Sequence, residues 1–85
     1  MNAKSVITIE LLGTQRTVAG IDRITMPIGK RAVMKDVLHF LRTNFPEMYL
    51  DDQKLQLAVN HEVVSPERIL KANDTVCLLP HIGGG

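Results

Sequence analysis

The stretch AVMKDVLHFLRTNFP, residues 32–46, is the segment of this chain whose apolar residues follow a helical period. Its large apolar side chains recur at spacings of three and four residues: Met34, Val37, Leu38, Leu41 and Phe45. This spacing predicts an α-helix with one apolar stripe, which Pro46 is expected to end. A single helix of this kind can cover one face of a sheet, so the flanking segments decide the fold class.

Two strand patterns precede the predicted helix. In SVITIELL, residues 5–12, apolar and polar side chains alternate with the period of a half-buried strand. RITMPI, residues 23–28, alternates as well, and Pro27 places this strand at a sheet edge because proline cannot donate a hydrogen bond to a neighbouring strand. The polar segment between them, residues 13–22, is expected to be a long loop that joins the two strands as a hairpin.

Three further strand patterns follow the predicted helix. The first is LQLAVN, residues 55–60, and a turn at residues 60–61 leads to a short strand over residues 62–64. A single helical turn is expected to begin at residues 65–66, Ser-Pro. With a last strand after the turn at residues 73–74, the order is strand, strand, helix, strand, strand, strand. This order predicts an α+β fold, a mixed sheet of four to five strands with one main helix packed on one face.

The last strand pattern, TVCLL, has two phases. Val76 and Leu78 are expected to face the helix, whereas Cys77 and Leu79 are expected on the opposite sheet face. Val6, in the first strand, has the same outward phase as Leu79. We therefore predict an apolar patch on the sheet face away from the helix, near the end of the chain.

Length and composition limit the possible functions. The chain has 85 residues, of which 45% are hydrophobic and 22% charged, so we expect one small globular domain without a deep enzyme pocket of its own. The formal net charge is +1, and the basic residues are scattered along the chain. This distribution predicts no binding to nucleic acid or to an anionic membrane surface.

The cysteine and histidine content argues against a metal centre. Cys77 is the single cysteine, which excludes an internal disulfide, and we interpret it as a packing or interface residue because a reactive thiol needs an electropositive, accessible setting. His39, His61 and His81 follow no metal-ligand spacing. No leader peptide and no long apolar span is apparent, so we expect a cytoplasmic protein without a bound metal or cofactor.

The chain ends in LLPHIGGG, residues 78–85, and three terminal glycines contribute almost nothing to folding. Glycine instead lets a backbone pass a constriction. Fully extended, Pro80 to Gly85 would span at most ~20 Å. A narrow glycine segment of this kind can carry the terminal carboxylate into a site in another protein. The alternative is that the terminus has no role.

Four stretches of the chain are similar to the ubiquitin-like sulfur-carrier family of the MoaD/ThiS type, which includes the small subunit of molybdopterin synthase and the thiamine-pathway carrier. The stretches are ITIELLGTQRTVAG, VMKDVLHFLRTNFPEM, LAVNHEVV and LKANDTVCLLPHIGGG. The most specific part is the ending, an apolar strand followed by Pro80, Ile82 and the pair Gly84-Gly85. The resemblance covers nearly the whole chain.

The resemblance implies a β-grasp domain over residues 1–79 and a flexible glycine tail over residues 80–85, with the last strand beside the first. It implies that a ubiquitin-activating-like enzyme uses ATP to adenylate the carboxylate of Gly85. A sulfur donor then converts that carboxylate to a thiocarboxylate. The other tail residues are Pro80, His81, Ile82, Gly83 and Gly84.

On this resemblance the protein is a carrier and cosubstrate, not an enzyme, and only the activating enzyme uses ATP. The outward patch of Leu79, Cys77 and Val6 is expected to dock the activating enzyme. Sulfur would pass to a larger acceptor, such as the large subunit of molybdopterin synthase or a thiazole synthase. Two alternatives stay open: a ubiquitin-like modifier joined to lysines through Gly85, and a non-conjugating β-grasp interaction module.

Overall fold

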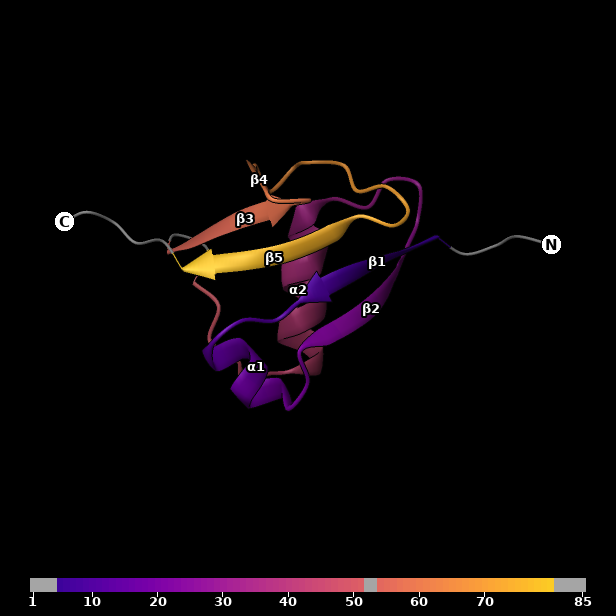
Figure 1. Cartoon of the computed structure of the whole chain (residues 1–85). Coiled ribbons are helices and arrows are strands. Elements are labelled where there is room, and N and C mark those ends of the chain that lie inside the picture. Colours follow the sequence, from indigo (N-terminus) through magenta and orange to yellow (C-terminus); the bar gives the residue numbers. More distant parts are fainter. Residues whose placement is uncertain (1–4, 52–53, 81–85) are drawn as a thin grey trace.

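A computed structural model describes residues 5–51 and 54–80, and these form a β-grasp fold (Figure 1). The elements in chain order are β1 (Ser5–Glu10), α1 (Thr14–Ala19), β2 (Arg23–Ile28), α2 (Met34–Asn44), β3 (Leu55–Val59), β4 (Glu62–Val64) and β5 (Thr75–Pro80). The predicted α+β class, with a mixed sheet and one main helix on one face, is confirmed. The sheet has five strands.

The strands lie in the order β2-β1-β5-β3-β4. The first and last strands, β1 and β5, are parallel neighbours at the centre of the sheet, as the resemblance implied. The other neighbouring pairs are antiparallel. The strand that contains Pro27 lies at one edge, so the edge position predicted from this proline is confirmed.

The core lies between α2 and one face of the sheet (Figure 1). The helix contributes four buried side chains, Met34, Val37, Leu38 and Leu41, and Phe45 packs beside them partly buried. The sheet contributes the inward residues of its central strands, among them Ile7, Ile9, Leu57, Val59, Val76 and Leu78. Burying each such aliphatic side chain contributes about 1.5 to 3 kcal/mol to folding.

A short helix, α1, occupies part of the segment that was expected to be a loop. It covers Thr14–Ala19 and lies between Gly13 and Gly20, whose φ angles of 54° and 76° favour glycine. Gln15 is its buried residue. The prediction failed because a helix of six residues with no apolar stripe gives no periodic signal.

The helical turn expected at residues 65–66 is replaced by a β-turn, in which the N–H of Arg68 donates to the carbonyl of Ser65 at 3.1 Å. The carbonyls of Pro66 and Arg68 accept the backbone N–H groups of Lys35 and Met34, at 2.9 and 3.0 Å. These N–H groups belong to the first turn of α2 and have no partner within the helix. The segment therefore supplies hydrogen-bond acceptors for the first N–H groups of α2 and does not form a helix of its own.

The turn between β3 and β4 is confirmed at Asn60 and His61. Both residues have positive φ angles, 51° and 74°, as a two-residue turn of the I′ type requires. Such a turn matches the twist of the strands that it connects and therefore fixes β4 against β3.

Candidate functional site

Most of the predicted tail, residues 81–85, lies outside the described residues, and so does Gly85, whose carboxylate is the expected reactive group. The structure describes the segment from which the tail leaves the sheet. Pro80, expected to begin the tail, is the last residue of β5 and pairs with Leu55. We call Leu78–Pro80 the root of the tail.

The root has a strand neighbour on one side only. β3 pairs with β5 up to Pro80, whereas β1 pairs with β5 only over Thr75–Cys77. Beyond Glu10 the chain turns away from β5, and the N–H of Leu11 donates to the carbonyl of Asp22 at 2.9 Å. From Leu78 onward, none of the strands in residues 5–51 and 54–80 therefore pairs with the edge of β5 that faces β1.

Gln15 of α1 occupies that edge. Its Nε2 donates to the carbonyl of Leu78 at 3.1 Å, and its Oε1 accepts the N–H of Leu12 at 3.3 Å. The residue is 7% exposed, and buried amide groups require such partners. Gln15 was not identified from the sequence, because a polar residue in a polar segment is ordinary. Its bond to Leu78, which is distant in sequence, is apparent only in the structure.

The start of β5 is held by a second polar cluster. Asp74, 7% exposed, accepts the N–H of Lys71 at 2.8 Å and the side-chain amide of Asn60 at 3.0 Å. The Oδ1 of Asn60 in turn accepts the N–H of Thr75 at 2.9 Å. Both ends of β5 are thus fixed by side-chain to backbone hydrogen bonds.

The outer face, the sheet face away from α2, carries Cys77 and Leu79 close to the root. Both side chains are half-buried, and Cys77 lies between Glu10 of β1 and Ala58 of β3. Burial, with a smaller effect of the Glu10 carboxylate, raises the pKa of the Cys77 thiol above its ordinary value. A protonated thiol is a weak nucleophile, which supports the packing interpretation of Cys77.

Val6 is not brought together with the other two residues of the predicted patch. It lies opposite Pro27 of β2, at the far end of β1, whereas Glu10 is level with Cys77. Six residues of strand, roughly 20 Å, separate Val6 from the level of Leu79. Leu12, 38% exposed, lies nearer the root, because Gln15 bonds both its N–H and the Leu78 carbonyl.

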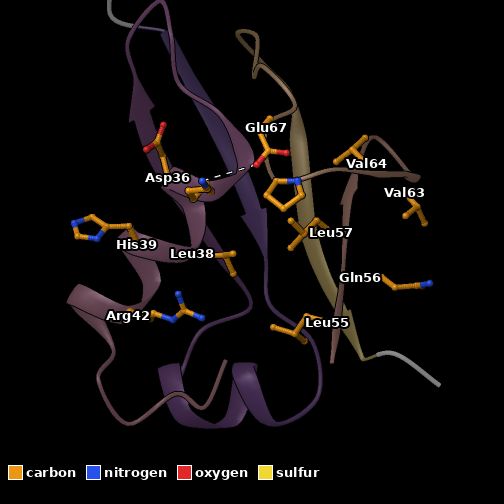
Figure 2. A pocket seen from close by; sticks show the side chains of 12 residues that line it. Asp36, Leu38, His39, Arg42, Leu55, Gln56, Leu57, Val63, Val64 and Glu67 are labelled. Carbon is orange, nitrogen blue, oxygen red and sulfur yellow. Dashed lines mark ion pairs between the residues drawn. The ribbon is translucent and has the colours of Figure 1, made fainter. Parts of the chain in front are cut away.

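A groove of about 780 Å³ lies between α2 and the strands β3 and β4 (Figure 2). Its apolar side chains include Leu38, Leu55 and Val64, and an ion pair joins Lys35 and Glu67 at 3.8 Å (Figure 2). The groove is open and of mixed polarity.

Neither a metal centre nor a membrane span is found in the described part of the chain. Within residues 5–51 and 54–80, no cluster of three or more histidine, cysteine or acidic residues is arranged to bind a metal ion. No helix in the same ranges is long and apolar enough to cross a bilayer.

Comparisons with known proteins identify a matching family and solved structures of the same fold. Residues 9–85 match the ThiS family, and the match extends to the last glycine. No curated protein matches the chain by sequence.

Solved structures match the fold along nearly the whole chain. SAMP1 from Haloferax volcanii is 21% identical with a TM-score of 0.76, and the match covers 94% of this chain and 99% of that one. A candidate molybdopterin converting factor, subunit 1, from Pyrococcus furiosus is 21% identical with a TM-score of 0.78, covering 92% and 99%. A chain of the Amycolatopsis orientalis BexX/CysO complex is 21% identical with a TM-score of 0.66, covering 93% and 99%. At this identity the likenesses establish the fold alone.

Proposed function

This chain belongs to the ThiS family of small ubiquitin-like carriers, which are not enzymes, and we propose that it carries sulfur on the C-terminal carboxylate of Gly85. An oxygen of that carboxylate attacks the α-phosphorus of ATP in the activating enzyme, and pyrophosphate leaves. Hydrosulfide supplied by the sulfur donor then attacks the acyl carbon, the bond from that carbon to the phosphate oxygen breaks, and AMP and a proton leave. The terminus becomes a thiocarboxylate, which the acceptor enzyme consumes.

The observation that carries this proposal is a family match that runs through Gly85, combined with a strand that ends at Pro80. Five residues follow Pro80, and three of them are glycines. Fully extended, these five residues reach at most ~18 Å beyond the sheet. Such a length allows the carboxylate to enter a narrow site while the folded domain stays outside.

The surface around the root is our proposed docking site for the activating enzyme. Leu79 and Cys77 lie on the outer face directly before the tail, and Leu12 is linked to the root through Gln15, which bonds both the Leu12 N–H and the Leu78 carbonyl. Val6 is at the far end of that face, so it contributes only if the interface extends along β1. The crystallised BexX/CysO complex, which contains a chain of this fold, supports docking of this domain to a protein partner.

The pathway proposed is cofactor synthesis of the molybdopterin or thiamine type. The acceptor is then a larger enzyme, such as the large subunit of molybdopterin synthase or a thiazole synthase. The resemblance to the molybdopterin converting factor subunit supports the first of these.

Protein modification is a second candidate function. It is supported by the structural likeness to small archaeal modifier proteins from two organisms, Haloferax volcanii and Methanosarcina acetivorans. In this case a lysine amine of the target, rather than a donor sulfur, attacks the Gly85 adenylate. Both functions begin with the same activated terminus.

Intact-mass spectrometry tests the proposal. The protein is incubated with an activating enzyme, ATP and a sulfur source, and we expect a mass gain equal to the replacement of one oxygen by sulfur. Deletion of Gly85 should abolish this gain, and the same deletion should leave the thermal unfolding midpoint unchanged. Lysine conjugates of higher mass in cells would favour the modifier.

The control is a sulfur carrier that the same enzyme is known to activate. If that carrier is loaded while this chain forms neither adenylate nor thiocarboxylate, the carrier proposal is wrong, and a β-grasp interaction module becomes the better explanation.

A further inference from the structure

We infer that Gln15 is a positioning residue: it fixes the direction in which the chain leaves β5 toward its reactive end. The role in activation rests on the proposed function, whereas the structural effect on the root does not. Gln15 touches none of the reacting atoms. It acts through the carbonyl of Leu78, two residues before β5 ends.

Among the described residues, no strand lies along this edge of β5 beyond Cys77. β1 pairs with β5 no farther than Cys77, so the Leu78 carbonyl on that side has no strand donor. The Gln15 amide supplies the donor, at 3.1 Å, in a buried position. It therefore replaces one hydrogen bond of a parallel ladder by a side-chain bond from α1.

Both ends of the Gln15 side-chain amide form hydrogen bonds. Nε2 donates to Leu78 while Oε1 accepts from Leu12, and the backbone N–H of Gln15 also donates to the carbonyl of Leu12 at 3.0 Å. The side chain thus joins α1, the end of β1 and the end of β5. An amide is needed here, because a carboxylate cannot donate and a thioether offers no N–H.

The consequence concerns the reach of the tail. Beyond Leu78, β3 is the only described strand that pairs with β5, at Leu79 and Pro80. Without the Gln15 bond, the root can rotate about this remaining edge. A small rotation at the root displaces a carboxylate at the end of a tail of up to ~18 Å by several times more than it displaces the root. Reaction rates depend steeply on such placement.

Two substitutions separate the parts of this role. Gln15→Met keeps the side-chain length and removes both hydrogen bonds. Gln15→Glu keeps the acceptor for Leu12 and loses the donor to Leu78 whenever the carboxyl is ionised. Asn44→Asp is the matched control, since the Asn44 amide also donates to a backbone carbonyl, that of Phe40 at 2.8 Å, but lies at the end of α2.

The first measurement needs no partner. We expect Gln15→Met to shift the carbonyl carbon resonance of Leu78 and to speed amide hydrogen exchange at Leu79. In Gln15→Glu these changes should appear as pH rises, because only the protonated carboxyl can donate to Leu78. Burial and this bond raise the pKa of the introduced carboxyl above its ordinary value, so native behaviour returns below that pKa and is lost above it.

The second measurement is the rate of pyrophosphate release with the activating enzyme. For Gln15→Met we expect kcat to fall roughly tenfold while KM changes less than about twofold, because docking is kept and placement is lost. For Asn44→Asp we expect kcat and KM to stay within about twofold of the wild-type values.

The results that overturn the inference are distinct. A folded Gln15→Met protein with wild-type kcat and KM would show that Gln15 only packs. If Gln15→Met fails to fold, Gln15→Glu decides. A protection factor at Leu79, which corrects exchange for its intrinsic pH dependence, would contradict the role if it kept the wild-type value both below and above the pKa of the introduced carboxyl. If no enzyme activates the wild-type chain but the resonance and exchange changes occur, the proposed function fails and the ordering role of Gln15 at the root stands.

Discussion

The two faces of β5 differ sharply in burial. Val76 and Leu78 point toward α2 and are fully buried, whereas Cys77 and Leu79, on the outer face, are half-buried. Neighbouring residues of one strand thus meet different environments, since successive side chains point to opposite sides of a sheet. The inner face holds the domain together, and the outer face is available to a partner beside the tail.

This difference has a measurable form. Substitutions on the inner face should change the free energy of unfolding and affect activation only through the amount of folded protein. Substitutions on the outer face should do the reverse. A substitution that strongly changes both the free energy of unfolding and the kinetics of activation would contradict this separation between the inner and outer faces.

The largest effect is expected for Leu78→Ala. The Leu78 side chain is 0% exposed within the core cluster, so its truncation leaves a cavity and should lower the free energy of unfolding by about 2 to 5 kcal/mol. Urea denaturation followed by circular dichroism measures this loss. KM for activation of the folded fraction should stay unchanged. A loss below about 1 kcal/mol would mean that the site collapses around the shorter side chain.

A smaller effect is expected for Leu79→Glu. The new carboxylate must be desolvated when the outer face docks, so KM for activation should rise roughly tenfold, while the free energy of unfolding changes by less than about 1 kcal/mol. Enzyme kinetics and urea denaturation of the same preparation measure the two quantities.

Two further variants sharpen this test. Val6→Glu makes a similar change on the same face but far from the root, so it should raise KM less than Leu79→Glu does. Ile69→Glu is the control, because Ile69 is 55% exposed in the loop that bridges to Val33, and KM should not respond. Equal effects of all three variants would show a response to charge alone and would contradict the docking surface.

Much of this architecture follows from period and turn chemistry. The five strands and α2 were predictable because their apolar residues repeat at two or at 3.6 residues, and because Pro27 and Pro46 mark an edge and a helix end. The inward phase of Val76 and Leu78 followed from the same alternation. The reactive carboxylate of Gly85 is predicted from the terminal glycines and from the family resemblance, and it stays a prediction because residues 81–85 lie outside the described part of the chain.

The support around the tail was not predictable in this way. Gln15 reaches Leu78 across 63 positions of sequence, and no local pattern encodes such a contact. The same limit applies to Val6, whose outward phase was apparent but whose distance from Leu79 depends on the register of β1 against β5. Phase is a local property of a strand, whereas position along a face is set by pairing.

The smallest expected effect concerns Cys77, which has the smaller of the two outward side chains next to the root. Because burial and the Glu10 carboxylate raise the pKa of its thiol, alkylation by iodoacetamide should be slower than for a free cysteine at neutral pH. The pH midpoint of the alkylation rate should lie above that of a cysteine peptide. Glu10→Gln should lower the midpoint slightly, since burial is the larger cause.

The same shift has a consequence for stability, and its sign can be tested. A folded-state pKa above the unfolded value means that the contribution of Cys77 is fully present below the unfolded pKa and is lost as pH rises through the folded pKa. Cys77→Ala should therefore flatten the alkaline part of the stability curve. Because it shortens one small side chain of the docking surface, Gly85 should still be loaded with sulfur, with a smaller rise in KM than Leu79→Glu causes. Rapid alkylation at neutral pH, or loss of loading in Cys77→Ala, would instead make Cys77 a participant in the chemistry, and the outer face would then be more than a docking surface.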